Sequence, residues 1–278
     1  MKLAFNGATT MKADLATDLE AARQAGFDLL EIWAAKLRTF LKSNAISDLK
    51  NLFVESGVPP LSINSIEHIT FRNPDDFAKL KEECEELSSI ASELGCPYLV
   101  VVPGKMPARA PSREEIIEKS AEVLSQLGSI AEKHGVGLGF EFLGQADCSV
   151  QTLGLAAEVV NAVALPNIGL VIDSFHFYAG GSTIDMIDDL DPERLFIFHI
   201  NDAANLPREQ LQDSHRLLPG LGVLPLREML KAFRRIGYDR VASVEIFRPE
   251  YWEWDPMELA RQAYLATNRV LETVKPRS

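Results

Sequence analysis

Four side chains that can bind a divalent cation stand at the ends of four successive apolar runs in the second half of the sequence. They comprise three carboxylates and one imidazole: Glu141, Asp173, His199 and Glu245. Burying one ionised group without a partner is costly, so four of them at matching positions favour a shared cation. Carboxylate and imidazole ligands suit Mn²⁺, Zn²⁺, Co²⁺ or Fe²⁺ better than Mg²⁺. We therefore expect one divalent metal ion, and its identity stays open because no thiolate ligand is evident to select zinc.

These runs belong to a pattern that repeats about eight times along the chain: a short apolar run, a polar loop and an amphipathic stretch with helical spacing. The run Tyr98–Val102 is apolar without alternation, which is typical of parallel strands covered on both faces by helices. The clearest helical stretches are 75–94 and 112–134, and a glycine follows each where a C-cap is expected. The apolar runs are 3–6, 28–33, 60–64, 98–102, 137–142, 168–173, 195–201 and 241–247.

The order of small and bulky residues within the last four runs indicates where the ligand-type side chains point. The residues two positions before each ligand are mostly small: Gly139, Val171, Ile197 and Ser243. The residues directly before each ligand are bulky: Phe140, Ile172, Phe198 and Val244. Successive strand residues face opposite sides, so the small set and the four ligands would share the inner face of a barrel.

Two architectures fit the repeating pattern, an open doubly wound sheet and a closed (β/α)8 barrel. In an open sheet the first and fourth of the ligand-bearing strands would lie about 14 Å apart. Side chains at that separation cannot both reach one ion through bonds of about 2 Å. Closure brings them together at the carboxyl ends of the strands, so we predict an α/β fold of the (β/α)8 TIM barrel type.

Length and charge set limits on the organisation and the partners of the chain. The 278 residues, 46% hydrophobic and 24% charged, contain no proline- or serine-rich linker and predict one domain spanning residues 1–278. The net charge of −12 argues against nucleic acid and anionic membranes as partners. Three cysteines without a C-x-x-C pair are typical of buried thiols in a reducing compartment. Without a leader-like start or an apolar stretch of about 20 residues, we expect a cytoplasmic protein.

Particular segments of the sequence are similar to one known family. Over nearly its whole length the chain resembles the xylose-isomerase-like barrels of the sugar-phosphate isomerase/epimerase superfamily. The ligand pattern is shared across that superfamily, whereas Asp-Ser-Phe-His and Glu-x-Phe-Arg-Pro-Glu-Tyr resemble a narrower branch that isomerises keto-inositols. The segments that carry the resemblance are 5–10, 171–177, 198–202 and 243–251.

The resemblance implies a role for six residues. Glu141, Asp173, His199 and Glu245 match the metal ligands of the family. His176 matches a histidine beside the metal that contacts substrate, and Arg216 matches an arginine that reaches substrate from the loop after the seventh strand. Taken alone, His176 would equally fit a loop histidine, and the alternative for Arg216 is a solvated loop arginine.

The implied reaction moves a ketone to the adjacent carbon of a cyclic polyol, of the type 2-keto-myo-inositol to 1-keto-D-chiro-inositol. Removal of the α-proton gives an enediolate, and reprotonation of the former carbonyl carbon completes the transfer. A divalent cation stabilises the developing negative charge. Glu141 and Glu245, three strands apart, match the general acid and base, and the sequence leaves open which takes the first proton. The implied partner is a small keto-polyol, with a homo-oligomer left open.

Further residues near the ends of other runs are weaker candidates for the substrate site. Aromatic residues after the second and eighth runs fit either a wall around a polyol or loop packing: Trp33, Tyr251, Trp252 and Trp254. Three polar residues end the first three runs, where we expect structural hydrogen bonding: Asn6, Glu31 and Asn64.

Other activities share the fold and the ligand set. Ketose 3-epimerases and hydroxypyruvate isomerase differ in substrate, and only branch-specific segments separate them from a keto-inositol isomerase. The apurinic endonuclease branch needs extra ligands on earlier strands and a basic groove, but here the fourth run ends in Val102-Pro103-Gly104 and the net charge is −12. A metal- and sugar-binding module without catalysis is the remaining alternative.

Overall fold

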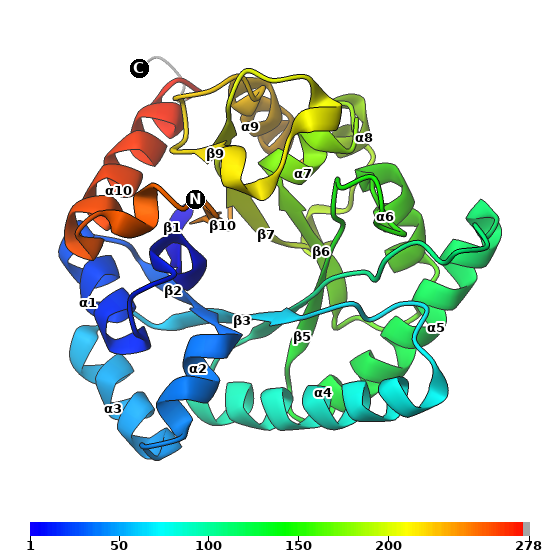
Figure 1. Cartoon of the computed structure of the whole chain (residues 1–278), viewed down its shortest axis with the longest axis horizontal. Helices are drawn as coiled ribbons and strands as arrows, with labels where there is room; N and C mark the ends of the chain where they lie inside the picture. Colours follow the sequence, from blue (N-terminus) through cyan, green and yellow to red (C-terminus); the bar gives the residue numbers. More distant parts are fainter. Residues whose placement is uncertain (275–278) are drawn as a thin grey trace.

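Eight parallel strands close into a barrel in the computed structural model, which describes residues 1–274. The barrel closes where the first strand pairs with the last, Lys2 lying opposite Val241 and Phe5 opposite Val244. Figure 1 shows the strands at the centre with the helices around them. All eight apolar runs of the sequence form the barrel, so the predicted fold is confirmed. The strands are β1 (Lys2–Asn6), β2 (Leu29–Trp33), β3 (Pro60–Ile66), β4 (Tyr98–Val101), β5 (Gly137–Glu141), β6 (Ile168–Asp173), β7 (Leu195–Ile200) and β10 (Val241–Val244).

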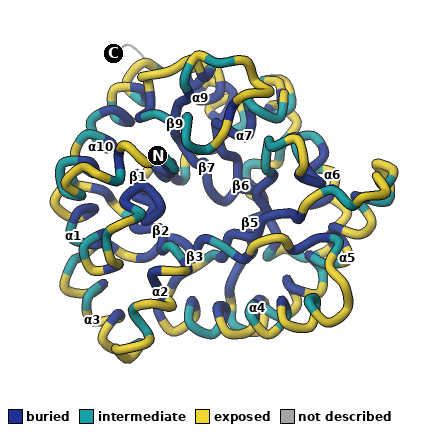
Figure 2. The backbone as a smooth tube through the Cα atoms, in the orientation of Figure 1, coloured by how far each residue is buried: buried dark blue, intermediate teal, exposed yellow. Residues whose placement is uncertain are grey.

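The helices cover the outside of the barrel, and the buried backbone lies at its centre (Figure 2). Short 3-10 helices lie in the loops between strands and helices: η1 (Gly7–Thr10), η2 (Pro192–Arg194), η3 (Arg208–Gln210), η4 (Asp213–His215) and η5 (Tyr251–Glu253). The helices are α1 (Leu15–Ala25), α2 (Ala34–Leu41), α3 (Ile46–Ser56), α4 (Pro74–Leu94), α5 (Arg113–Glu132), α6 (Leu153–Asn161), α7 (Ser174–Ala179), α8 (Asp185–Asp188), α9 (Leu226–Arg235) and α10 (Pro256–Glu272).

Local capping explains where the two longest helices begin and end. Helix α4 ends at Leu94 and is capped by Gly95, whose φ of 70° is left-handed and suits glycine. Helix α5 begins with a capping box, in which the Glu115 amide donates to Ser112 Oγ and the Ser112 amide donates to the Glu115 carboxylate. The sequence places its end too late: α5 stops at Glu132, and Gly135 closes the turn that follows.

The barrel interior follows the predicted alternation, with one irregularity. The bulky set of the last four strands packs outward with the helices, whereas Val171 and Ile197 belong to a separate inner cluster. Between Leu170 and Val171 the register of β6 against β7 shifts, and Phe196 joins the inner cluster. A Cβ at Gly169 would lie 2.6 Å from the Phe196 ring, so glycine there makes room for the aromatic side chain.

A buried ion pair holds the first turn of the chain against the barrel. Lys36 Nζ lies 2.7 Å from Asp18 Oδ2 and donates to the carbonyl oxygens of Gly7 and Thr10, each at 2.8 Å. Thr10 Oγ1 also donates to Asp18 Oδ1. The pair therefore links α1, α2 and η1 beside the strand end that carries Asn6.

A small antiparallel pair, β8 (Asp202–Ala203) with β9 (Arg216–Leu217), lies next to the barrel strands. Asp202 holds the loop beyond it, because its carboxylate accepts from the amides of Gly220 and Leu224. This anchored segment delivers Arg216 to the barrel. Within residues 1–274, no helix is both long and apolar enough to cross a membrane. The three cysteines are unpaired and buried, as expected.

Candidate metal and substrate site

The four predicted ligands come together at the carboxyl ends of their strands. Each offers a ligand atom, and these atoms all lie within 4.8 Å of one another. All four residues are buried, although Glu245 lies one residue beyond the end of β10. Asp173 also caps α7, since its Oδ1 accepts from the amide of His176 at 2.8 Å. The strand ends and the helix start thus fix the carboxylates before any cation binds.

His199 lies between carboxylates on both sides of its ring. Its Nδ1 is 3.0 Å from Glu141 Oε1 and 3.5 Å from Glu245 Oε2. Its Nε2 is 3.1 Å from both oxygens of Glu31, which is fully buried on β2. Structural hydrogen bonding was expected of Glu31, but its contact with a candidate ligand was not. Glu31 lies in the middle of β2 and not, as the sequence suggested, at the end of its run. A charged residue inside an apolar run was the signal that could have revealed the contact.

Arg216 enters the same cluster as a buried cation. Its Nη1 lies 2.8 Å from Asp173 Oδ2 and 3.0 Å from Glu245 Oε2. Its Nη2 lies 3.0 Å from Nε2 of His176, whose Nδ1 accepts from the Gly144 amide at 3.2 Å. The structure therefore brings both predicted substrate contacts, His176 and Arg216, directly beside the predicted ligands.

Two asparagines hold the remaining oxygen of Glu245. Asn64 Nδ2 donates to Glu245 Oε1 at 2.8 Å, and Asn6 Nδ2 donates to the same atom at 3.1 Å. Asn201 Nδ2 similarly donates to Asp173 Oδ2 at 2.7 Å. These amides orient the carboxylates without adding charge, as expected for Asn6 and Asn64.

The crowding of charges shifts several pKa values. Burial, together with the neighbouring Glu141 and Asp173 charges, raises the pKa of Glu245 to about 8, against the lowering effect of His199 and Arg216. Burial disfavours the His199 imidazolium, but the surrounding glutamates outweigh it and raise the pKa of His199 well above its usual value. Burial and the Arg216 charge lower the pKa of His176. An excess of negative charge is therefore concentrated at the ligand cluster, where a divalent cation would neutralise it.

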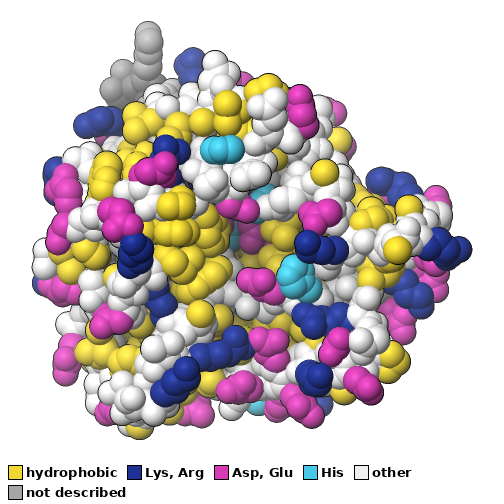
Figure 3. All heavy atoms as spheres, viewed as in Figure 1, with side chains coloured by type: hydrophobic (Ala, Val, Ile, Leu, Met, Phe, Trp, Pro, Cys, Tyr) yellow, Lys and Arg dark blue, Asp and Glu magenta, His cyan; other side chains and the backbone are white. Residues whose placement is uncertain are grey.

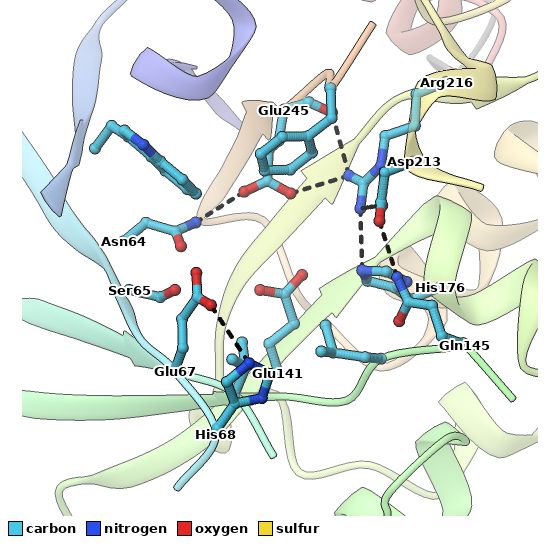
Figure 4. A pocket seen from close by; sticks show the side chains of 14 residues that line it. Asn64, Ser65, Glu67, His68, Glu141, Gln145, His176, Asp213, Arg216 and Glu245 are labelled. Carbon is cyan, nitrogen blue, oxygen red and sulfur yellow. Dashed lines mark hydrogen bonds and ion pairs between the residues drawn. The ribbon is translucent and has the colours of Figure 1, made fainter. Parts of the chain in front are cut away.

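A cavity of about 270 Å³ opens above the cluster. Figure 3 shows a hollow in the middle of this face, with acidic and histidine side chains in and around it. In Figure 4, Glu141 and Glu245 point toward one another across the cavity, with His176 and Arg216 on one side. Lining residues that the sequence did not single out are Ser65, Glu67, His68, Leu143, Gln145, Asp213 and Phe247.

Of the four aromatic residues that fitted either a polyol wall or loop packing, only Trp33 lines this cavity. Trp33 lies beside it and packs edge-on against Phe247, with ring centroids 5.5 Å apart. Trp252 instead donates its indole N–H to the carbonyl oxygen of Ala8, and Tyr251 is buried. Trp254 is 41% exposed and packs on Tyr251. The aromatic residues after β10 therefore pack loops, apart from Phe247.

The closed parallel barrel and its buried carboxylate–imidazole cluster define the class of protein. The chain belongs to the xylose isomerase-like TIM barrel family, whose model matches residues 19–268. It is 38% identical over 273 residues to an inosose isomerase of Bacillus velezensis, covering 98% of this chain and 97% of that protein. It is 36% identical over 283 residues to an inosose isomerase of Halalkalibacterium halodurans, covering 99% and 100%.

A crystal structure of the IOLI protein with a zinc atom bound has the same fold. It superimposes with a TM-score of 0.96 at 36% identity and covers 100% of both chains. The similarity thus extends over the whole barrel, including all the strand ends that carry the cluster.

Proposed function

We propose that this protein is a metal-dependent isomerase that moves a ketone to the adjacent carbon of a cyclic polyol, interconverting 2-keto-myo-inositol and 1-keto-D-chiro-inositol. The observation that carries the proposal is the pair Glu141 and Glu245, whose carboxylates face one another across a cavity above a ligand cluster. Relatives of nearly the same length are named inosose isomerases, which supports a keto-inositol substrate.

The donor set fits a divalent metal ion. Three carboxylates and an imidazole suit Zn²⁺, Mn²⁺, Co²⁺ or Fe²⁺, and the zinc in the IOLI structure makes Zn²⁺ the first to test. We assign the ligands as Glu141, Asp173, His199 and Glu245. When bound, the ion supplies Lewis-acid polarisation of the ketone and of the neighbouring hydroxyl group.

The surroundings of the two glutamates support different roles in proton transfer. Glu245 accepts from Asn6 and Asn64 on one oxygen, and its other oxygen contacts Arg216. Glu141 Oε1 contacts His199, whereas Oε2 takes no hydrogen bond from the residues that the structure describes, and the side chain lines the cavity. We assign Glu141 as the base that takes the α-proton and Glu245 as the group that returns a proton to the former carbonyl carbon. The proton of the adjacent hydroxyl group passes to the former carbonyl oxygen, which completes the balance.

His176 and Arg216 complete the substrate site in this proposal. The Arg216 guanidinium carbon lies 5.0 Å from the ring centroids of Phe175 and Phe247, which keep its plane in place. Its charge orients oxygen atoms of the substrate and stabilises negative charge that develops on them. Trp33 and Phe247 border the cavity and exclude water from one face of a polyol ring.

Hydrogen exchange tests the proposed reaction directly. The protein loaded with Zn²⁺ or Mn²⁺ is incubated with 2-keto-myo-inositol in D₂O, and products are followed by NMR. We expect deuterium at the carbon next to the ketone and formation of 1-keto-D-chiro-inositol. Deuterium at an α-carbon with inverted configuration, without a moved ketone, would indicate a 3-epimerase activity. No label with inososes, ketohexoses or hydroxypyruvate would leave a binding module and contradict the proposal.

A further inference from the structure

Glu31 is a buried carboxylate in the middle of β2 that the proposed reaction does not use. Its side chain is fully buried, yet it has hydrogen-bond partners on three other strands. Ser62 Oγ donates to Oε1 at 2.7 Å, and Ser243 Oγ donates to Oε2 at 2.6 Å. Asn64 Nδ2 makes a longer contact of 3.4 Å with Oε1. These contacts hold the carboxylate in one position inside the barrel.

The fourth partner of this carboxylate is the ring of His199. Nε2 lies 3.1 Å from each oxygen of Glu31, so a proton on Nε2 is shared between both. An ionised carboxylate only accepts hydrogen bonds, and the two serine hydroxyls are donors to it. Nε2 must therefore carry the proton in this contact.

The opposite ring nitrogen faces the other candidate ligands. Nδ1 lies 3.0 Å from Glu141 Oε1 and 3.5 Å from Glu245 Oε2. In the metal-free cluster Nδ1 also faces a carboxylate, so it too carries a proton. A cation that binds at Nδ1 displaces that proton, and the proton toward Glu31 stays on Nε2. A carboxylate that binds the remote N–H of a metal-ligating histidine fixes the ring orientation and makes the imidazole a stronger ligand.

We propose that Glu31 is a positioning residue: it fixes the proton of His199 on Nε2 and directs Nδ1 to the metal ion. The inference rests on the metal centre of the proposed function. Glu31 lies on the far side of the ring from the cluster, so it touches neither the ion nor the substrate. The hydroxyl groups of Ser62 on β3 and Ser243 on β10 each bind one oxygen of Glu31. These two hydrogen bonds prevent the carboxylate from turning toward the cation.

Cobalt binding to the full-length protein tests this role. Glu31→Gln keeps the size of the side chain and an oxygen that accepts from Nε2, but it removes the charge. We expect the dissociation constant for Co²⁺, measured by calorimetry, to rise about 10- to 100-fold. The matched control is Asp18→Asn, which neutralises another fully buried carboxylate that pairs with Lys36 instead of a ligand. We expect the control to lower the melting temperature and leave Co²⁺ affinity within twofold of the wild type.

A second measurement needs no variant. In the Co²⁺-loaded wild type, the Nε2 proton should give a paramagnetically shifted NMR signal that is lost in D₂O only slowly, because Glu31 and the barrel shield it. Absence of that signal, an unchanged affinity in Glu31→Gln, or an equal loss in Asp18→Asn would each overturn the inference. Wild-type protein that binds Co²⁺ tightly with the slow signal but never isomerises an inosose would contradict the proposed function and leave the role of Glu31 intact.

Discussion

Asp213 accepts two hydrogen bonds from Arg216 through one carboxylate oxygen, at 3.1 Å from Nε and 2.8 Å from Nη2. The remaining nitrogen, Nη1, contacts Asp173 and Glu245. One edge of the guanidinium is therefore fixed by the loop before β9, while the other faces the ligand cluster. Gln145 in turn donates to the second oxygen of Asp213 at 2.9 Å, which ties this loop to the one after β5.

Replacing Asp213 by alanine should weaken substrate binding more than it slows the chemical step. The guanidinium would keep its charge and its contacts with Asp173 and Glu245 but lose the carboxylate that fixes its Nε/Nη2 edge. Loss of charge-assisted hydrogen bonds of this kind corresponds to a rise in KM of about tenfold or more. Steady-state kinetics with the keto-inositol substrate measures it, and kcat should fall less than KM rises.

The control for this variant is Asp147→Ala, which removes an exposed carboxylate paired with Lys105 at 2.9 Å. Its kinetics should match the wild type. An unchanged KM in Asp213→Ala, or a loss confined to kcat, would show that the loop does not orient Arg216 for substrate.

Glu141→Gln and Glu245→Gln should each abolish turnover while the barrel stays folded. Both substitutions keep the size of the side chain and remove the group that moves a proton, a contribution of about 10²- to 10⁴-fold. Since Glu141 is assigned the first proton, its variant should also stop deuterium exchange from the substrate. The Glu245 variant should retain some exchange without product. Near-normal turnover in either variant would refute its acid–base role, and circular dichroism checks the fold.

The barrel and the ligand cluster were predictable because their signals are local. Runs such as Tyr98–Val102 are apolar on both faces, and a period of two residues places Glu141 and His199 on the inner face. Closure of the sheet then determines that the four ligands meet. The bulge at Phe196 was not predictable, because it depends on the space that Gly169 leaves on the neighbouring strand.

The contacts between distant loops and strands lie outside the reach of a single sequence. Glu31 is 168 residues from His199 and 212 residues from Ser243, so only the folded barrel shows them in contact. The hydrogen bond between Asp213 and Arg216 spans only three residues. Its role in the site could not be predicted, because it depends on the contact that Arg216 makes with the distant Asp173. Tyr251 and Trp252 were ambiguous because loop packing and ring binding use the same residue types.

Removal of the metal should inactivate the protein and lower its stability. Without a cation, the converging carboxylates repel one another, which is one reason why the pKa of Glu245 rises to about 8. Adding Zn²⁺ to the chelator-treated protein at 100 times its dissociation constant should stabilise the fold by about 2.7 kcal/mol. Below pH 8 the ion must displace a proton, so its affinity should increase as the pH rises toward 8. Calorimetric titrations between pH 6 and pH 8 measure this trend. Full activity after exhaustive chelation would contradict the metal centre.

Folding stability should depend on pH through Asp18, away from the proposed site. Burial raises the pKa of Asp18 to about 6, even though Lys36 and Thr10 stabilise the carboxylate. The folded state then binds a proton more tightly than the unfolded chain. The contribution of Asp18 to stability is therefore complete below about pH 4 and is lost as the pH rises through 6. A shift of this size corresponds to about 3 kcal/mol.

Comparison with Asp18→Asn isolates this effect, because the variant lacks the titrating group. We expect the unfolding free energy of the wild type minus that of the variant to decrease by about 2 kcal/mol between pH 4 and pH 7. Denaturant unfolding at pH 4, 5, 6 and 7 measures the difference. The double variant Asp18→Asn/Lys36→Met removes the unpaired ammonium as well and serves where the single variant unfolds. A difference that grows with pH would mean that pairing with Lys36 outweighs the burial of the carboxylate.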